Sequence, residues 1–356
     1  MKFFYIWLCL FSSLPLLAQS VKPEATDVLS LGKTLPLTPA LQTLTQQLVK
    51  QPDNDAVRLE AVQLYLQGAR KPGFDDWFHQ AQALLDELSS TSRNSDSYWL
   101  LLADMQQQQH QFATALESLQ RVFERDAANI NASLMAARIY LAQNNTAAAQ
   151  QACARLWQEL FLFSVCSYEV AGRRGNAIQS YTALQQLYSQ QKSLSVALDS
   201  WLRGILAEQA EMLGKPQQAI GWLEPALPQA PVSLWLKWAD LSLQQDASAA
   251  VYARLQPLEQ EYGLTDGLLL RLALAERNTK QGERYMTQLE PRMMLRIARG
   301  DKDHAADMVH YFLAVQPDAQ AALHWAQLNY ASAKEPDDLM LLQRARSAVQ
   351  QEEGGL

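Results

Sequence analysis

The feature that most constrains the fold of this chain is an internal repeat of 34 residues. Residues 98–129, which read YWLLLADMQQQQHQFATALESLQRVFERDAAN, align with residues 130–157 under one constant shift. The shift places small and apolar residues on one another: Ala103 on Ala137, Ala115 on Ala149, Leu119 on Cys153 and Val122 on Leu156. A fixed period of this length is typical of stacked units, none of which can bury its apolar face alone.

The composition predicts that these units are helical. The chain has 356 residues, of which 48% are hydrophobic, so it can bury a large core. Ala, Leu and Gln dominate and are compatible with helix, whereas the Val-Ile-Thr alternation that forms strands is almost absent. Only 14 glycines and 14 prolines interrupt the pattern, so we expect an all-α chain.

The unit resembles that of the tetratricopeptide repeat family, which consists of two antiparallel helices. The family pattern has an aromatic residue and a Leu-small pair in the first helix, a midway turn residue, a small residue early in the second helix and a late proline. In residues 98–129 these places are taken by Trp99, Leu102, Ala103, His110, Ala115 and Ala127, so the proline is missing. Later units keep more of the pattern: Leu206, Ala207, Gly214, Ala219, Leu223, Ala226 and Pro231 in one, and Gly300, Ala305, Phe312 and Pro317 in another.

This resemblance implies an all-α fold, a right-handed superhelical solenoid of antiparallel helix pairs with seven or eight units and a concave inner wall. Small residues let paired helices approach closely, and Gly or Asn can take the left-handed conformation that the turns require. Asn144, Asn145 and Gly172 lie where such turns are expected.

The chain divides into five expected segments. They are a signal peptide (1–20), an N-terminal linker (21–37), an N-terminal repeat array (38–191), a C-terminal repeat array (192–331) and a capping helix with a tail (332–356). The boundary at residue 192 rests on residues 192–200, which match no repeat position and are interpreted as a hinge. An insertion at residues 68–77, GARKPGFDDW, is expected to widen the turn of the first unit.

The first residues have the features of a cleaved secretory signal. Lys2 precedes an apolar run over residues 3–17, and the small residues Ala18 and Ser20 fit a cleavage site near Ser20. An uncleaved membrane anchor is the alternative, but the run is short for a bilayer and Pro15 interrupts it. We therefore expect export to the periplasm of a Gram-negative bacterium, with no stable membrane insertion after cleavage.

The net charge excludes two classes of partner, and the cysteine content predicts a disulfide. The formal charge is −7, and cleavage would remove Lys2 and no acidic residue. Nucleic acid and anionic membranes are bound through excess Lys and Arg, so neither is an expected partner.

Cys153 and Cys166 would lie in an oxidising compartment, and a structural disulfide is favoured over two buried free thiols. Such a bridge would be worth roughly 3 kcal/mol in the chain-entropy model.

The resemblance also implies a partner-binding groove, lined by the first helix of each unit. The inward stripe then comprises Leu100, Asp104, Gln107, Gln108, Asn131, Arg138, Trp201, Glu208 and Glu211. Amides, one arginine, acids and an aromatic side chain suit an extended peptide or a partner's helix. The stripe lacks the several Lys and Arg of a carboxylate clamp, so acidic C-terminal tails are disfavoured. The alternative for the glutamines is that they are merely good helix formers on a wet face.

Two further clusters have a structural and a functional interpretation. One consists of the aromatic residues Trp222, Trp235, Trp238 and Trp325, for which helical spacing favours packing between helix pairs over recognition. The other is the basic face of Arg292, Arg296 and Arg299, for which pairing with Glu290 and Asp301 is favoured over anion binding.

Catalysis has little support in the sequence. The histidines His79, His110, His304, His310 and His324 are scattered, and His304 and His310 do not have the i, i+4 spacing that holds a metal ion. There is no GxSxG motif, no phosphate-binding loop and no glycine-rich turn after a strand. We expect no enzyme activity, no cofactor and no metal.

The sequence therefore predicts a non-catalytic periplasmic adaptor or scaffold, which binds another protein or peptide of the cell envelope in its groove and serves envelope complex assembly. One alternative is a binding module for a cell-wall glycan or small ligand, with Trp201 and Trp235 as the stacking platform. The other is a self-assembling structural repeat protein. The oligomeric state is left open.

Overall fold

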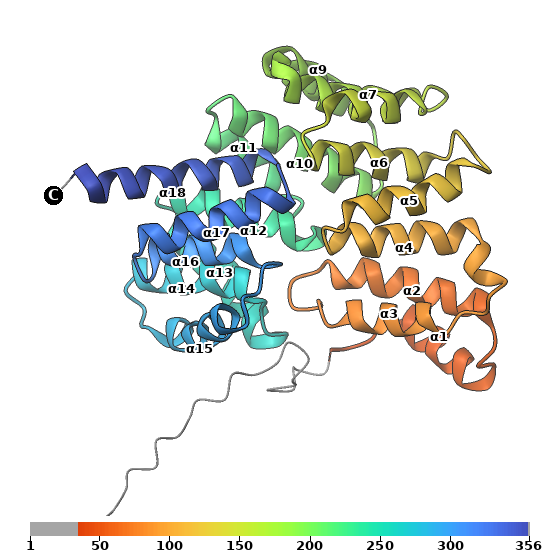
Figure 1. Ribbon diagram of the computed structural model, residues 1–356, viewed down its shortest axis with the longest axis horizontal. Helices are drawn as coiled ribbons and strands as arrows, with labels where there is room; N and C mark the ends of the chain where they lie inside the picture. The colour runs from red at the N-terminus through yellow and green to blue at the C-terminus, as the bar shows by residue number, and fades with distance from the viewer. Residues whose placement is uncertain (1–34, 355–356) are drawn as a thin grey trace, which may run out of the picture.

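The structure, a computed structural model, describes residues 35–354, and this part of the chain forms helices without a strand (Figure 1). The predicted signal peptide and the linker up to residue 34 lie outside the described residues. Eight consecutive helix pairs make up the described chain, between α1 (Pro39–Lys50) and α18 (Pro336–Gly354). The predicted all-α repeat solenoid is confirmed.

Each pair consists of a first and a second helix. The first helices are α2 (Asp55–Ala69), α4 (Asp96–Gln108), α6 (Ile130–Ala142), α8 (Leu160–Ala171), α10 (Val196–Met212), α12 (Val232–Gln244), α14 (Asp266–Asn278) and α16 (Ala305–Ala314). The second helices are α3 (Trp77–Asp86), α5 (Phe112–Phe123), α7 (Thr146–Ala154), α9 (Ala177–Ser189), α11 (Pro216–Leu223), α13 (Ser248–Glu261), α15 (Arg284–Arg299) and α17 (Ala319–Ser332). Short helical turns lie at η1 (Ser92–Asn94), η2 (Gly172–Asn176) and η3 (Leu227–Gln229).

The turns within the pairs use left-handed residues, as the repeat pattern requires. Within the pairs, a positive φ occurs for example at His110, Asn144, Gly214 and Lys280, whereas Gly300, which also has a positive φ, joins α15 to α16 between two pairs. Asn145 instead caps α7, where its side chain accepts a hydrogen bond from the amide of Ala148. The expectation that Gly172 makes a turn is wrong, because its φ is −59° and Gly175 carries the positive φ of 99°. Gly172 instead allows a close approach: a Cβ there would lie 2.5 Å from Nε2 of Gln209.

The helices pack in two layers. Neighbouring first helices contact one another, for example α2 with α4 and α12 with α14, while each second helix packs against its own first helix. The small residues that define the repeat lie between the layers, and Ala103, Ala115 and Ala149 are fully buried. The helices can therefore approach closely at these positions.

A disulfide joins Cys153 at the end of α7 to Cys166 of α8, with the Cα atoms 5.6 Å apart. Both cysteines are buried in the same apolar cluster. The bridge ties the second helix of one unit to the first helix of the next. It lies at the junction where the repeat spacing is compressed, because Ala177 follows Ala149 by only 28 residues.

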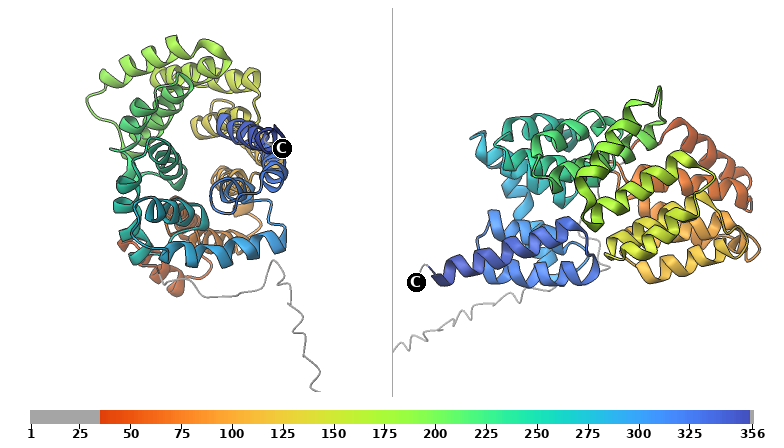
Figure 2. Two further views of the ribbon diagram at one scale, coloured as in Figure 1. Left: turned by 90° about the vertical axis from the view of Figure 1, so that its left-hand side faces the viewer. Right: turned by 90° about the horizontal axis from the view of Figure 1, so that it is seen from above.

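The stack curls until its C-terminal half meets its N-terminal half. In Figure 2 (left), the blue C-terminal helices lie beside the yellow helices of the N-terminal array. Two backbone hydrogen bonds, each 2.7 Å long, cross between the halves. The amide of Lys334 donates to the carbonyl of Ala142, and the amide of Val232 donates to the carbonyl of Arg70.

The insertion in the first unit, residues 68–77, contributes to this closure. The ring of Phe74 lies 5.0 Å from that of Tyr262, in the loop between α13 and α14. At Gly73 a Cβ would lie 2.4 Å from the carbonyl oxygen of Gly263, so glycine is required at this close approach. The insertion thus bridges the first unit to a unit almost 200 residues later. No helix within residues 35–354 has the length and apolarity needed to cross a bilayer.

Candidate functional site

Charged side chains recur along the first helices at the spacing of the repeat. Arg70 at the end of α2 is ion-paired with Asp104 of α4, 34 residues later. Arg173, which follows α8, is ion-paired with Glu208 of α10, 35 residues later. Equivalent positions of neighbouring units are adjacent in a solenoid, so these pairs link unit to unit. We call the set at these positions the inner ladder: Arg70, Asp104, Arg138, Arg173, Glu208, Asp240, Arg271 and Asp307.

The C-terminal rungs of the inner ladder are the most buried. The side chain of Arg271 on α14 is 3% exposed and lies 2.8 Å from both Asp240 of α12 and Asp307 of α16. Arg271 holds the pKa of Asp240 below its usual range, although burial alone would raise it. Burial and the charge of Arg271 lower the pKa of His310 to about 4, so this histidine is neutral at pH 7. These groups fix the positions of three first helices.

Arg138 of α6 differs from Arg271 in its exposure and in its lack of an ion-pair partner among the described residues. It is exposed, and among residues 35–354 no carboxylate lies within salt-bridge distance of it. Asn131, about two turns earlier on the same face of α6, is also exposed. Both residues belong to the stripe predicted from the sequence, and both leave donors available to a partner.

The glutamine tract of α4 divides between the core and the surface. The amide oxygen of Gln106 accepts a hydrogen bond from Oγ of Ser118 at 2.8 Å, so this glutamine joins the two helices of its pair. Gln107 and Gln108 are half-buried and belong to the predicted stripe. Leu100 is half-buried against the apolar cluster below it. The tract therefore ends α4 with one structural amide, Gln106, and two half-buried ones, of which Gln108 has its Nε2 atom buried.

Three acids of the predicted stripe are engaged within the chain. Asp104 and Glu208 belong to the inner ladder, and burial raises the pKa of Asp104 although Arg70 opposes the shift. Glu211 lies 2.6 Å from Nζ of Lys237 on α12. Trp201, the aromatic member of the stripe, is half-buried against the C-terminal core. These residues stabilise the solenoid and have less capacity left for a partner.

Sequence reasoning placed three ladder residues in the groove, namely Asp104, Arg138 and Glu208. It missed Arg70, Arg173, Asp240, Arg271 and Asp307, which complete the inner ladder. The signal was present in the spacing, because opposite charges recur 31 to 36 residues apart on successive first helices. Charge periodicity at the repeat length would have found them.

The tryptophan and arginine clusters have structural roles. Trp235, Trp238 and Trp325 are at most 7% exposed and pack in the C-terminal core. Trp235 therefore cannot serve as a stacking platform for a glycan. Arg296 is ion-paired with Asp266 and Asp301, both at 2.5 Å, and Arg292 lies 3.3 Å from Asp266.

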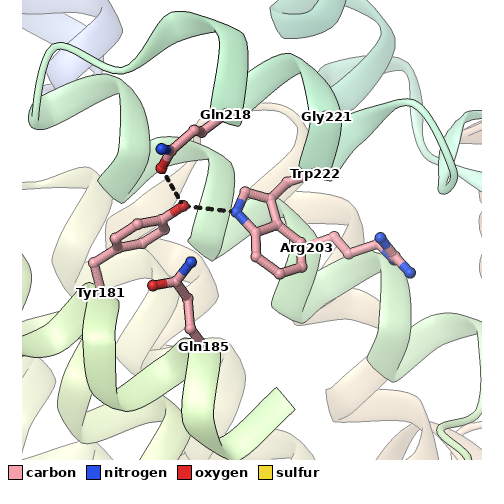
Figure 3. Close-up of a pocket in the computed structure, with 6 residues that line it drawn as sticks. All are labelled: Tyr181, Gln185, Arg203, Gln218, Gly221 and Trp222. Atoms are coloured by element: carbon pink, nitrogen blue, oxygen red, sulfur yellow. Dashed lines mark hydrogen bonds between the residues drawn. The ribbon is translucent and has the colours of Figure 1, made fainter. Parts of the chain in front are cut away.

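Trp222, the fourth tryptophan of the predicted aromatic cluster, borders a hollow of about 330 Å³ (Figure 3). Its lining comes from α9, α10 and α11: Tyr181, Gln185, Arg203, Gln218, Gly221 and Trp222. The hydroxyl of Tyr181 accepts a hydrogen bond from Nε1 of Trp222 at 2.9 Å and donates to Gln218 at 3.0 Å. These polar atoms already satisfy one another, so the hollow makes a weaker case for a ligand than the exposed groups on α6.

The described residues offer no arrangement suited to metal chemistry. Within residues 35–354, no three His, Cys, Asp or Glu side chains lie close enough to hold a metal ion together. The arrangement on the first helices is one of paired charges and amides, which suits recognition of peptide groups through hydrogen bonds.

The geometry defines an all-α repeat solenoid, and a family comparison identifies the repeat. Residues 107–160 match the model of the tetratricopeptide repeat family. This part of the chain therefore has the sequence features of a tetratricopeptide repeat, in agreement with the 34-residue register. Proteins with this repeat generally mediate protein–protein interactions and are generally non-catalytic scaffolds.

Comparisons with whole proteins give distant similarities. No curated protein sequence matches this chain. Among solved structures it is similar to the APC/C hetero-tetramer Cut9–Hcn1, at 14% identity over 86% of this chain and 65% of that one, with a TM-score of 0.35. It is also similar to Naa15/Naa10 bound to HypK-THB, at 12% identity over 86% and 52%, with a TM-score of 0.31. It is similar as well to the tetratricopeptide-repeat domain of P58(IPK), at 11% identity over 88% of this chain and 93% of that one, with a TM-score of 0.22. The chain thus spans less than two thirds of the first two.

Proposed function

We propose that this protein is a non-catalytic adaptor that binds a peptide or helix of another cell-envelope protein on the first-helix surface of its N-terminal array. The proposed contact residues are Leu100, Gln107, Gln108, Asn131 and Arg138 on α4 and α6. The surface is smaller than the stripe expected from the sequence, because the acids of that stripe are engaged in ion pairs of the chain itself.

The observation that carries this proposal is the exposed guanidinium of Arg138. The inner ladder pairs Arg70 with Asp104 and Arg173 with Glu208, whereas Arg138 between these pairs is exposed and has no carboxylate within salt-bridge distance among residues 35–354, although its charge acts on Glu169 and Glu335. A guanidinium presents a planar set of donors that fits a carboxylate or two carbonyl oxygens. A partner that supplies such acceptors would complete the ladder.

The neighbouring amides extend the same chemistry. Gln107 and Asn131 lie on adjacent first helices, and each side chain can both donate to and accept from a peptide backbone. Leu100 adds an apolar contact beside them. A surface of this kind favours an extended segment or the polar end of a helix, for which side-chain amides replace water at the backbone.

The cellular setting of the proposal is the envelope. It rests on the charge, apolar run and small residues of the N-terminal 20 residues, which have the pattern of an export signal. Fractionation of cells that express the full chain, with sequencing of the mature N-terminus, tests this part separately.

The partner surface is tested by in-cell crosslinking and affinity capture with a matched pair of variants. The test variant carries Gln107→Ala and Arg138→Ala on α4 and α6. The control carries Gln120→Ala and Arg121→Ala on α5, where both side chains are exposed on the second-helix layer. Each variant loses one amide and one guanidinium, so the two are equal in charge and composition.

The proposal predicts a protein that is captured by the native chain and by the control but is lost from the test variant, at unchanged helicity. The captured protein is then purified, and its affinity for all three chains is measured by titration calorimetry. Equal affinity for the three chains would exclude the proposed surface.

A further inference from the structure

The hollow bordered by Trp222 lies between the second helices α9 and α11, close to the predicted boundary between the arrays at residue 192 (Figure 3). It is therefore on other helices than the proposed partner surface of α4 and α6. Its volume of about 330 Å³ is at the lower end of the range for ligand sites, which is roughly 300–1,000 Å³. A hollow of this size suits a small group, such as one residue of a partner.

The aromatic floor of the hollow is held in place by its neighbours. Nε1 of Trp222 donates to the hydroxyl of Tyr181 at 2.9 Å, and this hydroxyl donates to Oε1 of Gln218 at 3.0 Å. The ring of Trp222 also meets that of Tyr188 edge-on, with the centroids 5.3 Å apart. Tyr181 is 3% exposed and Trp222 is half-buried, so Trp222 offers the accessible aromatic surface. A ring fixed in this way loses little freedom when a ligand packs on it.

Two side chains beside this floor have polar groups that the chain does not use. In Figure 3 the amide of Gln185 points toward the two rings, and it forms no hydrogen bond with residues 35–354. Arg203 is held by Asp199, which accepts from its Nε at 2.7 Å, and by the hydroxyl of Tyr188. Its Nη1 donates to no residue of the described chain. A ligand in the hollow would therefore meet positioned donors that are still available.

Gly221 leaves the floor uncovered. It lies inside α11, where glycine destabilises a helix relative to alanine. Packing explains two other helix glycines, because a Cβ would lie 2.2 Å from Trp77 at Gly68 and 3.0 Å from Asp307 at Gly267. At Gly221 no described atom beyond its own stretch of helix lies within 4 Å of such a Cβ. This glycine thus serves no contact within the described chain, and its effect is to keep the hollow open.

The balance of donors and acceptors indicates the class of ligand. None of the six lining residues is Asp or Glu. Nη1 of Arg203 and the amide nitrogens of Gln185 and Gln218 are donors, and the amide oxygen of Gln185 is the acceptor left beside them. A glycan would bring many hydroxyl donors, and those without an acceptor would lose their bonds to water. A peptide backbone instead brings carbonyl acceptors, which match the donors.

We propose that the hollow is a second peptide-binding site, on the second-helix side of the solenoid. An apolar side chain of an extended segment packs on Trp222, and the backbone carbonyl groups beside it accept hydrogen bonds from Gln185 and Arg203. The site goes beyond the proposed function and does not depend on it, since it shares no residue with the surface of α4 and α6.

The site is tested with peptides that the protein itself selects. The full chain is immobilised and used to select from a library of phage-displayed linear dodecapeptides, and the selected peptides are synthesised with blocked ends. Their affinities for the native chain, Gly221→Leu and Gln185→Ala are measured by titration calorimetry. Gly221→Leu fills the space over Trp222 without removing a contact. The trimer of N-acetylglucosamine is titrated as the glycan probe.

We expect peptides with an apolar residue whose Kd rises at least about tenfold in Gly221→Leu. In Gln185→Ala, which loses one hydrogen bond, the Kd should rise about two- to tenfold. The matched control is Gln186→Ala, because this neighbouring glutamine of α9 is exposed and does not line the hollow. The control should bind as the native chain does. Thermal unfolding should show that Gly221→Leu is at least as stable as the native chain.

Equal affinities for the native chain and Gly221→Leu would overturn the proposal, and so would a selection that yields no peptide. Binding of the trimer that is lost in Gly221→Leu would make the hollow a glycan site and would also overturn it. If Gly221→Leu is destabilised, the comparison of Gln185→Ala with Gln186→Ala decides. Peptides that lose affinity only for the Gln107→Ala, Arg138→Ala variant would support the first-helix surface instead, so the two proposals fail separately.

Discussion

Two arginines of the inner ladder, one in each array, have opposite surroundings. In the C-terminal array Arg271 is 3% exposed and is held between two carboxylates at 2.8 Å. In the N-terminal array the equivalent Arg138 is exposed and has no carboxylate at salt-bridge distance among residues 35–354. The same residue type at the same repeat position is thus a structural element in one array and an available donor in the other.

The difference indicates at which positions a solenoid of this kind can use a charged residue for partner binding without losing stability. Removing one member of a buried ion pair leaves an uncompensated charge, so a buried rung is fixed by stability. An exposed rung contributes little to stability and is free to serve recognition. Partner binding is therefore expected in the N-terminal array.

The largest effect should follow from Arg271→Ala. This change leaves Asp240 and Asp307 buried without their cation, and we expect a loss of about 3–5 kcal/mol in the free energy of unfolding. Arg138→Ala, the equivalent change in the N-terminal array, should cost less than about 1 kcal/mol. Urea denaturation followed by circular dichroism compares the two, and equal losses would remove the distinction between the arrays.

Loss of the disulfide should have the next largest effect, and it should act on the N-terminal array. In Cys153→Ala with Cys166→Ala, the free energy of unfolding should fall by roughly 3 kcal/mol, because the unfolded chain gains the freedom that the bridge removes. Hydrogen exchange should increase in α7 and α8 and stay unchanged around Arg271. Increased exchange over α12–α16 instead would mean that the two arrays unfold as one unit.

Acid should weaken the C-terminal array over a defined interval. The pKa of His310 is about 4 in the folded chain, against an ordinary value of 6.5, and the groups facing it are Arg271, Arg344, Asp240 and Asp307. Below pH 6.5 the unfolded state binds the proton and the folded state does not, so stability falls between pH 6.5 and pH 4. The upper limit of this loss is about 3 kcal/mol.

The histidine contribution is isolated with His310→Gln, by comparing slopes of stability against pH and not absolute stabilities. The native chain should show the steeper fall between pH 6.5 and pH 4. Parallel slopes would mean that other groups cause the acid sensitivity.

The sequence alone predicted those structural features that recur with the repeat or depend on neighbouring residues. The 34-residue register predicted the helix pairs because small residues such as Ala103 and Ala149 must recur where helices touch. The turn at Asn144 followed from its tolerance of positive φ. Gly172 was misread because a glycine can serve either a turn or a close approach, and only the position of Gln209 decides between them.

The closure of the stack could not be predicted, because it depends on how small rotations between units add up over the whole array. Val232 meets Arg70 and Lys334 meets Ala142, and neither pair has a local sequence signature. The candidate surface was predicted in part for the same reason. The stripe identified Arg138 correctly as a first-helix residue, but it could not show that Glu211 would be taken up by Lys237.

The smallest effect is expected from the proposed partner surface itself. The Gln107→Ala, Arg138→Ala variant should change the free energy of unfolding by no more than about 0.5 kcal/mol per site, because neither side chain lies in a buried ion pair. Its partner affinity should nevertheless fall at least tenfold, as expected when an arginine at the centre of an interface is truncated. Urea denaturation and titration calorimetry on the same sample compare the two quantities. A large loss of stability would place Arg138 with Arg271 as a structural residue, and the functional contrast between the arrays would be wrong.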